Sequence, residues 1–219
     1  MVKRKPTNKY YFSVEGETEH WYLKWLQDMI NDTEAAACKV SIDCPVNKNP
    51  LKHVKALTVT RKIEVCHFFD YESNEQHYVK AFQETLDNMK KAEKIGKQVK
   101  YKSGYSNFTF DLWIILHMMN CNSSYSHRKQ YITSINQSFG EKFHNMDEFK
   151  EEANFKRCLK KMNLSNVISA IDRAKKIMQK NYENGYTLYQ YKGYEYYKEN
   201  PSLAAWEAIE KILTDCNLI

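Results

Sequence analysis

The sequence lacks the closely spaced cysteines that mark zinc ribbons and thiol redox sites. Its six cysteines are scattered along the 219 residues without a C-x-x-C pair, so we expect buried, unreactive thiols. No apolar run approaches the roughly 20 residues that would cross a bilayer. The basic start, MVKRKPTNKYYFSV, leads into a strand pattern without the apolar core of a signal peptide. We therefore expect a cytoplasmic protein with no membrane segment.

Several motifs of nucleotide enzymes and hydrolases are missing as well. The chain has no Walker loop, no G-x-G-x-x-G, no H-E-x-x-H and no G-x-S-x-G, which leaves motor ATPases, dinucleotide oxidoreductases, zincins and serine hydrolases unsupported. What the chain does have is the composition of a globular protein, 42% hydrophobic and 27% charged. Its net charge of +6 permits a polyanionic partner without requiring one.

Strand and helix patterns alternate over the first half of the chain. The segments with strand character are 8–16, 38–46, 63–73 and 97–104. Amphipathic segments separate them, and an apolar segment over 107–120 is predicted as a buried helix. This order predicts an α/β fold, a mostly parallel sheet flanked by helices. We expect a core over 1–124 and a helical C-terminal part over 125–219, packed together as one integral domain.

Two of the predicted strands end in carboxylates. Glu15 follows the first strand, and Asp70 and Glu72 follow the third. Ligands of open parallel sheets bind beyond the carboxyl ends of the strands, so these acids converge if the two strands are neighbours. Carboxylate oxygens suit Mg²⁺ or Mn²⁺, which stabilise charge on a phosphate and activate water. The plain alternative is solvation at a helix start, which is a sufficient account of Glu17.

Five segments, in this order, resemble the RloB-like family of bacterial restriction and phage-defence loci. They are VEGETEHWY, FFDYES, SNFTFDLWIILHM, NVISAIDRAKKIM and NPSLAAWEAIEKIL, and the resemblance spans residues 8 to 215. That family is related to the Toprim fold, in which a glutamate after the first strand and a later D-x-D organise metal-dependent phosphodiester chemistry. The resemblance implies a Toprim-like nuclease of an anti-phage or abortive-infection system.

The resemblance assigns roles to four acids. Glu15 stands at the Toprim glutamate, a metal ligand or general acid/base, and Asp70 stands at the first, metal-binding acid of the D-x-D. Glu72 replaces the usual second aspartate and reaches one methylene further, so the geometry and number of metal ions stay open. Glu19 completes an E-G-x-x-E pattern and would face the site one helical turn along.

The third segment keeps the family's motif in part. Asp111 replaces a glutamate, and as a first-turn residue of the predicted helix it is the better candidate for the site. His117 lies six residues later on a different face, where a core histidine is favoured over a substrate contact. Ser106 and Asn107 precede the helix and would cap it, or hold a phosphate with its free N–H groups. Capping is the favoured role of the two.

Basic and aromatic segments could contact a nucleic acid. Lys102 belongs to a cluster of six lysines over 90–102, which would screen phosphates or form a solvated face. Residues 182–201 hold seven of the sixteen tyrosines. Their rings would pack the C-terminal helices onto the sheet or stack unpaired bases, and packing is the commoner role.

These observations favour a Mg²⁺- or Mn²⁺-dependent nuclease. RNA, such as tRNA, is favoured over DNA, because abortive defence often stops translation. Two alternatives stay open: a non-catalytic effector or regulatory subunit that binds a partner ATPase encoded beside it, and an enzyme of phosphoryl transfer on a small nucleotide. The oligomeric state stays open.

Overall fold

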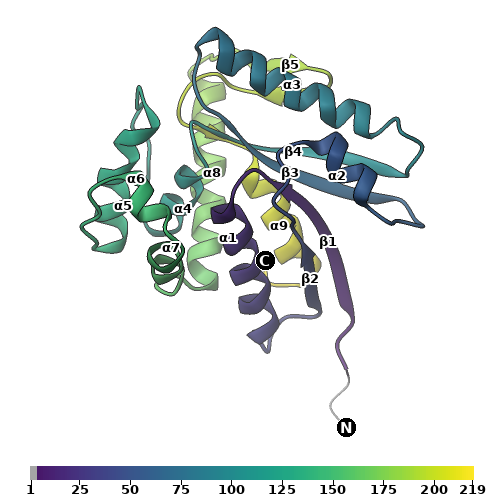
Figure 1. Ribbon diagram of the computed structural model, residues 1–219. Coiled ribbons are helices and arrows are strands. Elements are labelled where there is room, and N and C mark those ends of the chain that lie inside the picture. The colour runs from purple at the N-terminus through teal and green to yellow at the C-terminus, as the bar shows by residue number, and fades with distance from the viewer. Residues whose placement is uncertain (1–3) are drawn as a thin grey trace.

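The computed structural model describes residues 4–219 and is built around a five-stranded sheet (Figure 1). The strand order is β2-β1-β3-β4-β7, with β1 Thr7–Val14, β2 Lys39–Asp43, β3 Ile63–Tyr71, β4 Val99–Asn107 and β7 Ser202–Leu203. The first four strands run parallel, and β7 pairs with β4 in the antiparallel sense. The predicted α/β class, with a mostly parallel sheet flanked by helices, is confirmed.

Helices cover both faces of the sheet. One face packs against four helices, namely α1 Glu17–Asp32, α4 Asp111–Met118, α8 Leu164–Glu183 and α9 Ala205–Asp215. The other face packs against α2 Pro50–Ala56, α3 Gln76–Ala92 and a hairpin of β5 Tyr189–Tyr191 and β6 Tyr194–Tyr196. Because successive side chains of a strand alternate between faces, Phe68 joins the first core and Phe69 the second. Both faces of β3 are therefore buried, as expected for a central parallel strand.

A glycine lets β4 run further than its sequence pattern predicts. The predicted strand stops at Gly104, but β4 continues to Asn107. A Cβ at Gly104 would lie 2.4 Å from Cδ1 of Phe68 on the neighbouring strand, so only glycine fits at this close approach. The helix predicted over 107–120 accordingly begins later, at Asp111, and ends at Met118.

The segment after residue 125 supplies more than helices. A 3₁₀ turn, η1 Arg128–Gln130, and three short helices, α5 Tyr131–Phe139, α6 Met146–Lys150 and α7 Glu152–Leu159, form the group at the left of Figure 1, where α5 packs on α4 and α7 on α1. Beyond α8, the chain adds the β5–β6 hairpin and β7, which the sequence pattern does not predict.

No helix within residues 4–219 has the length and apolarity needed to cross a bilayer.

Candidate functional site

Four acids meet where the parallel strands end. Glu15 directly follows β1, and Asp70 is the penultimate residue of β3. The two strands are neighbours, with Val14 opposite Phe68, as convergence of these acids requires. Glu19 lies in the first turn of α1, and Asp111 is the first residue of α4. Because β4 is the other neighbour of β3, the start of α4 comes to the same edge.

Glu15 occupies a partly buried position against the end of β3. The backbone N–H of Asp70 donates to Oε2 of Glu15 over 3.4 Å. Burial raises the pKa of Glu15 to about 7, and the charge of Glu19 adds to the rise, while the N–H of Asp70 opposes it. A carboxyl group with a pKa near neutrality can both take up and release a proton at physiological pH.

Glu19 and Asp70 are more deeply enclosed. Glu19 is 5% exposed and its Oε2 accepts a hydrogen bond of 2.9 Å from the hydroxyl of Thr18. Burial raises the pKa of Glu19. Burial also raises the pKa of Asp70 well above its ordinary value, and the charges of Glu19 and Glu15 push it in the same direction. Acids crowded in this way resist full ionisation unless a cation joins them.

Lys150 is the cation that the structure places among these acids. Its Nζ lies 2.9 Å from Oδ2 of Asp111, a carboxylate whose side chain is 1% exposed. The hydroxyl of Thr109 donates to the same oxygen over 2.7 Å. Although burial opposes it, the charges of Asp111 and Asp70 raise the pKa of Lys150. Lys150 therefore stays protonated and offsets part of the negative charge.

Two carboxylate oxygens in this group have no partner. Oδ1 of Asp70 and Oδ1 of Asp111 are buried and accept no hydrogen bond within residues 4–219, which is costly unless another group meets them. An oxygen-only donor set with free buried oxygens fits a hard cation such as Mg²⁺ or Mn²⁺. Within residues 4–219, no group of three or more His, Cys, Asp or Glu side chains is spaced so that it could hold a metal ion without moving.

Gly16 gives Glu19 the space that it occupies. The backbone of Gly16 is extended, with φ of −142°, so its conformation is open to any residue. A Cβ there, however, would lie 3.0 Å from Oε2 of Glu19. The absence of a side chain at Gly16 therefore leaves space for the carboxylate of Glu19.

Glu72 stands apart from the buried acids. Its Oε2 lies 2.8 Å from Nη1 of Arg128, and both side chains are partly exposed. The charge of Glu72 still contributes to the raised pKa of Glu15. Arg128, in η1, thus holds the acid that stands at the second position of the D-x-D pattern.

Ser106 and Asn107 are strand residues, so the prediction that they cap the following helix is wrong. The residue before α4 is Phe110, and no side chain caps this helix. Asn107 is fully buried, and its amide donates to the carbonyls of Lys198 and Glu199 over 3.0 and 3.2 Å. Ser106 is also buried, opposite Asp70, and its hydroxyl has no partner within residues 4–219.

His117 is a core histidine, the role favoured from the sequence. It is fully buried, with Nδ1 2.8 Å from the carbonyl of Trp113 and Nε2 3.1 Å from the hydroxyl of Tyr22. Burial lowers the pKa of His117 to about 4, so the ring is neutral at physiological pH. Both ring nitrogens are occupied inside the protein.

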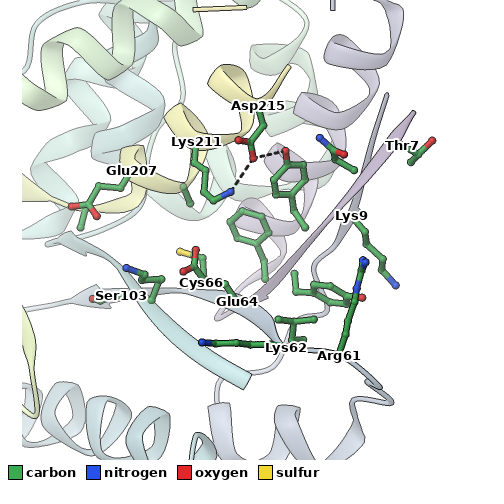
Figure 2. Close-up of a pocket in the computed structure, with 18 residues that line it drawn as sticks. Thr7, Lys9, Arg61, Lys62, Glu64, Cys66, Ser103, Glu207, Lys211 and Asp215 are labelled. Carbon is green, nitrogen blue, oxygen red and sulfur yellow. Dashed lines mark hydrogen bonds and ion pairs between the residues drawn. The ribbon is translucent and has the colours of Figure 1, made fainter. Parts of the chain in front are cut away.

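Lys102 lies away from the acids, at a cavity of about 680 Å³ near the amino ends of β1 and β3. Figure 2 shows this cavity between those strands and α9, with Lys9, Arg61 and Lys62 on one side and Glu207 on the other. Lys211 bonds Asp215 at its rim over 2.9 Å. The structure does not bring Lys102 together with Glu15, Asp70 or Asp111.

Three residues of the site were not predicted from the sequence, namely Thr109, Arg128 and Lys150. Thr109 had a local signal, since a hydroxyl two residues before a helix-starting aspartate is placed to bond it. Lys150 and Arg128 had none, because they sit on short elements whose position depends on how α5 to α7 pack.

A comparison with known protein families bears on this arrangement. The sequence model described as RloB-like protein matches residues 10–212, nearly the whole chain. No curated protein and no solved structure matched.

Proposed function

We propose that this chain, which belongs to the RloB-like protein family, is a metal-dependent nuclease that hydrolyses phosphodiester bonds. The observation that carries the proposal is the meeting of Glu15, Glu19, Asp70 and Asp111 at one sheet edge, where two buried oxygens have no partner among the described residues. Such a group of acids is costly to bury without a function that uses it.

The chemistry follows from the positions of these side chains. Glu15, Asp70 and Asp111 would hold Mg²⁺ or Mn²⁺, which supplies charge stabilisation on the phosphate and an acidified water. Alternatively, Glu15 stays off the metal, where its pKa of about 7 suits it to act as the general acid or base at neutral pH. Lys150 holds the carboxylate of Asp111 in place, since Nζ and Oδ2 lie 2.9 Å apart.

The biological setting rests on the family. An RloB-like nuclease would act in the cytoplasm as an effector of an anti-phage or abortive-infection system. RNA, such as tRNA, is favoured over DNA, because stopping translation halts phage production directly.

Cleavage by the purified protein tests the proposal. Total RNA and plasmid DNA are incubated with Mg²⁺, Mn²⁺ or EDTA, beside Glu15→Gln and Asp70→Asn. Because each variant removes an acid of the site, we expect metal-dependent cutting that falls about a hundredfold or more in both. Glu17→Gln is the matched control, since Glu17 is exposed on the same helix start and its variant should cut like the parent. Equal cutting by all four proteins would contradict the proposal.

A second candidate is a non-catalytic subunit that binds a partner ATPase. It is favoured by the ion pairs that already join Lys150 to Asp111 and Arg128 to Glu72, because they neutralise acids without a metal. An ATPase from the same locus, if one is encoded there, would provide the discriminating arm. If the folded protein cuts nothing with any metal when that ATPase and ATP are present, yet co-purifies with it, the second candidate replaces the first.

A further inference from the structure

A cavity of about 600 Å³ opens past the carboxyl ends of β3 and β4. It is lined by Ser73, Asn74, Glu75, Phe108, Ser124, Tyr125, Ser126, Tyr186, Lys198, Glu199 and Asn200. Ser73 is the residue after Glu72, and Phe108 directly follows β4 and precedes Thr109. The cavity therefore lies where β3 and β4 end, at the same edge of the sheet as the acids, although none of the four acids lines it. Its volume is that of a small-molecule site.

One wall of this cavity is held in place by reciprocal amide hydrogen bonds. The side-chain amide of Asn107 donates to the carbonyls of Lys198 and Glu199. In return, the amide of Asn200 donates to the carbonyl of Asn107 over 2.7 Å, and its Oδ1 accepts from the backbone N–H of Tyr125 over 3.1 Å. These bonds fix the wall to the end of β4, so the cavity is a built feature of the fold.

The lining combines an exposed aromatic ring with a buried acceptor. Tyr186 is 41% exposed, whereas Tyr194, Tyr196 and Tyr197 of the same tyrosine-rich stretch are 8%, 3% and 4% exposed. Oε2 of Glu199 is buried and meets no hydrogen-bond donor within residues 4–219. An unpartnered carboxylate oxygen calls for a donor from a ligand.

A nucleobase matches both features. Its face stacks on an aromatic ring, as in proteins that bind single strands, and an amino group on its edge donates to a carboxylate, as cytosine does to Glu or Asp. Guanine, adenine and cytosine carry such an amino group, whereas uracil and thymine present carbonyl oxygens at that position. In a duplex both faces of a base are covered by its stacked neighbours, so only an unpaired, unstacked base can lay its face on Tyr186 while its amino group donates to Glu199.

We infer that this cavity binds an unpaired, amino-bearing base of the strand whose phosphate lies at the acids. The inference rests on the proposed function for that phosphate and adds the substrate class, a single-stranded nucleic acid. Tyr186 supplies the stacking surface, and Glu199 selects against uracil and thymine.

Binding of oligonucleotides tests the inference without cleavage. Labelled oligocytidine and oligouridine strands of equal length, as RNA and as DNA with thymidine for uridine, are titrated in EDTA onto the Glu15→Gln protein. We expect tighter binding of the cytidine strands. Adding Tyr186→Leu should weaken binding about tenfold, because base stacking on one ring is lost, whereas Tyr186→Phe should keep the affinity. Adding Glu199→Gln should remove most of the preference for cytidine.

Tyr182→Leu is the matched control, because Tyr182 is 72% exposed and does not line the cavity. The inference is overturned if Tyr186→Leu and Glu199→Gln bind and discriminate as the parent does while circular dichroism shows both folded. If the wild type cuts no nucleic acid even with the partner ATPase and ATP present, but the binding pattern holds, the inference stands and hydrolysis is refuted. If the wild type cuts and neither variant alters binding, hydrolysis stands and the inference is overturned.

Discussion

Lys150 sets the charge balance of the acid site. Within residues 4–219 it is the one cation at ion-pair distance from Asp111. Burial raises the pKa values of Glu19 and Asp70, and the charge of Lys150 lowers them. At physiological pH the ammonium group therefore makes it easier for these acids to be ionised together. A metal ion that joined the site would share this role, and Lys150 would then be free to meet a phosphate.

Replacing Lys150 with Met should destabilise the protein. The variant leaves Asp111 buried without its counter-charge. Because the Lys150 side chain is 37% exposed, we expect the free energy of unfolding to fall by about 2 kcal/mol, less than for a fully buried pair. The pKa values of Glu19 and Asp70 are raised in the folded state, so their ionisation disfavours folding as pH rises. The loss should therefore be larger at pH 8 than at pH 5, measured by urea unfolding in EDTA.

Lys156→Met is the control for this prediction. Lys156 pairs with Glu152, and the two side chains are 48% and 60% exposed, so that variant should change stability by only a few tenths of a kcal/mol. A Lys150→Met protein with the stability of the control at both pH values would contradict the role given to Lys150.

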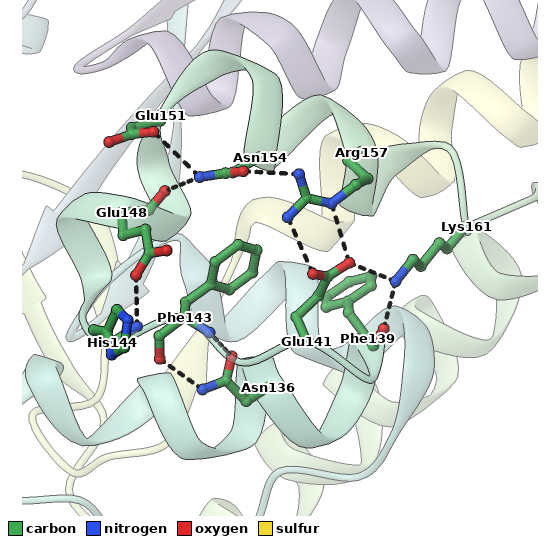
Figure 3. Close-up of polar contacts among 10 residues, drawn as sticks. All are labelled: Asn136, Phe139, Glu141, Phe143, His144, Glu148, Glu151, Asn154, Arg157 and Lys161. Carbon is green, nitrogen blue, oxygen red and sulfur yellow. Dashed lines mark hydrogen bonds and ion pairs between the residues drawn. The ribbon is translucent and has the colours of Figure 1, made fainter.

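At the scale of elements, the carboxylate of Glu141 joins α5 to α7. Glu141, in the loop after α5, accepts from Nη2 of Arg157 over 3.0 Å and from Nζ of Lys161 over 2.6 Å (Figure 3). Lys161 also bonds the carbonyl of Phe139. This cluster joins the end of α5 to α7 and to the turn after it, and α6, which ends in Lys150, lies between them in the chain.

Glu141→Gln should destabilise the protein at neutral pH and not in strong acid. The hydrogen bonds from Arg157 and Lys161 lower the pKa of Glu141 to about 2. A depressed pKa stabilises the fold above the ordinary value near 4.5, and this contribution is lost as pH falls from there towards 2. Because both cations are partly exposed, we expect the free energy of unfolding of the variant to be about 1 kcal/mol lower than that of the parent at pH 7. This difference should shrink as the pH falls.

Thermal unfolding of parent and variant from pH 7 to pH 3 measures this difference. Glu152→Gln serves as the reference, because Glu152 pairs with a single exposed lysine and its removal should have little effect. A difference between parent and Glu141→Gln that does not vary with pH would show that the lost hydrogen bonds, and not the charge, stabilise this group.

The long elements could be predicted from the sequence, and the short ones could not. Strands β1 to β4 and helices α1, α3 and α8 span enough residues for a period to show. Strands β5, β6 and β7 are two or three residues long, too short for any periodicity. The same division holds for the site. Glu15 and Asp70 stand at the ends of long strands and Asp111 starts the helix after β4, whereas Lys150 ends a helix of five residues.

At the scale of the whole molecule, metal binding should raise the melting temperature. A cation that binds the folded chain alone raises the melting temperature, and a concentration about a hundredfold above Kd adds about 2.7 kcal/mol. For a chain of this size we expect about 5 °C or more with Mn²⁺ in the wild type. Asp70→Asn should lose most of this shift and Glu17→Gln should keep it. Equal shifts in all three proteins would place the metal elsewhere.

The order of the site residues along the chain has a consequence for biosynthesis. Glu15, Glu19, Asp70 and Asp111 are all synthesised before Lys150, and the segment anchored on Asn107, residues 198–200, comes later still. A nascent chain that stalls between Asp111 and Lys150 carries every acid without its counter-charge and without β7 beside β4. The charge balance of the site therefore forms only after Lys150 has been synthesised, and the contacts of Asn107 form only after residues 198–200.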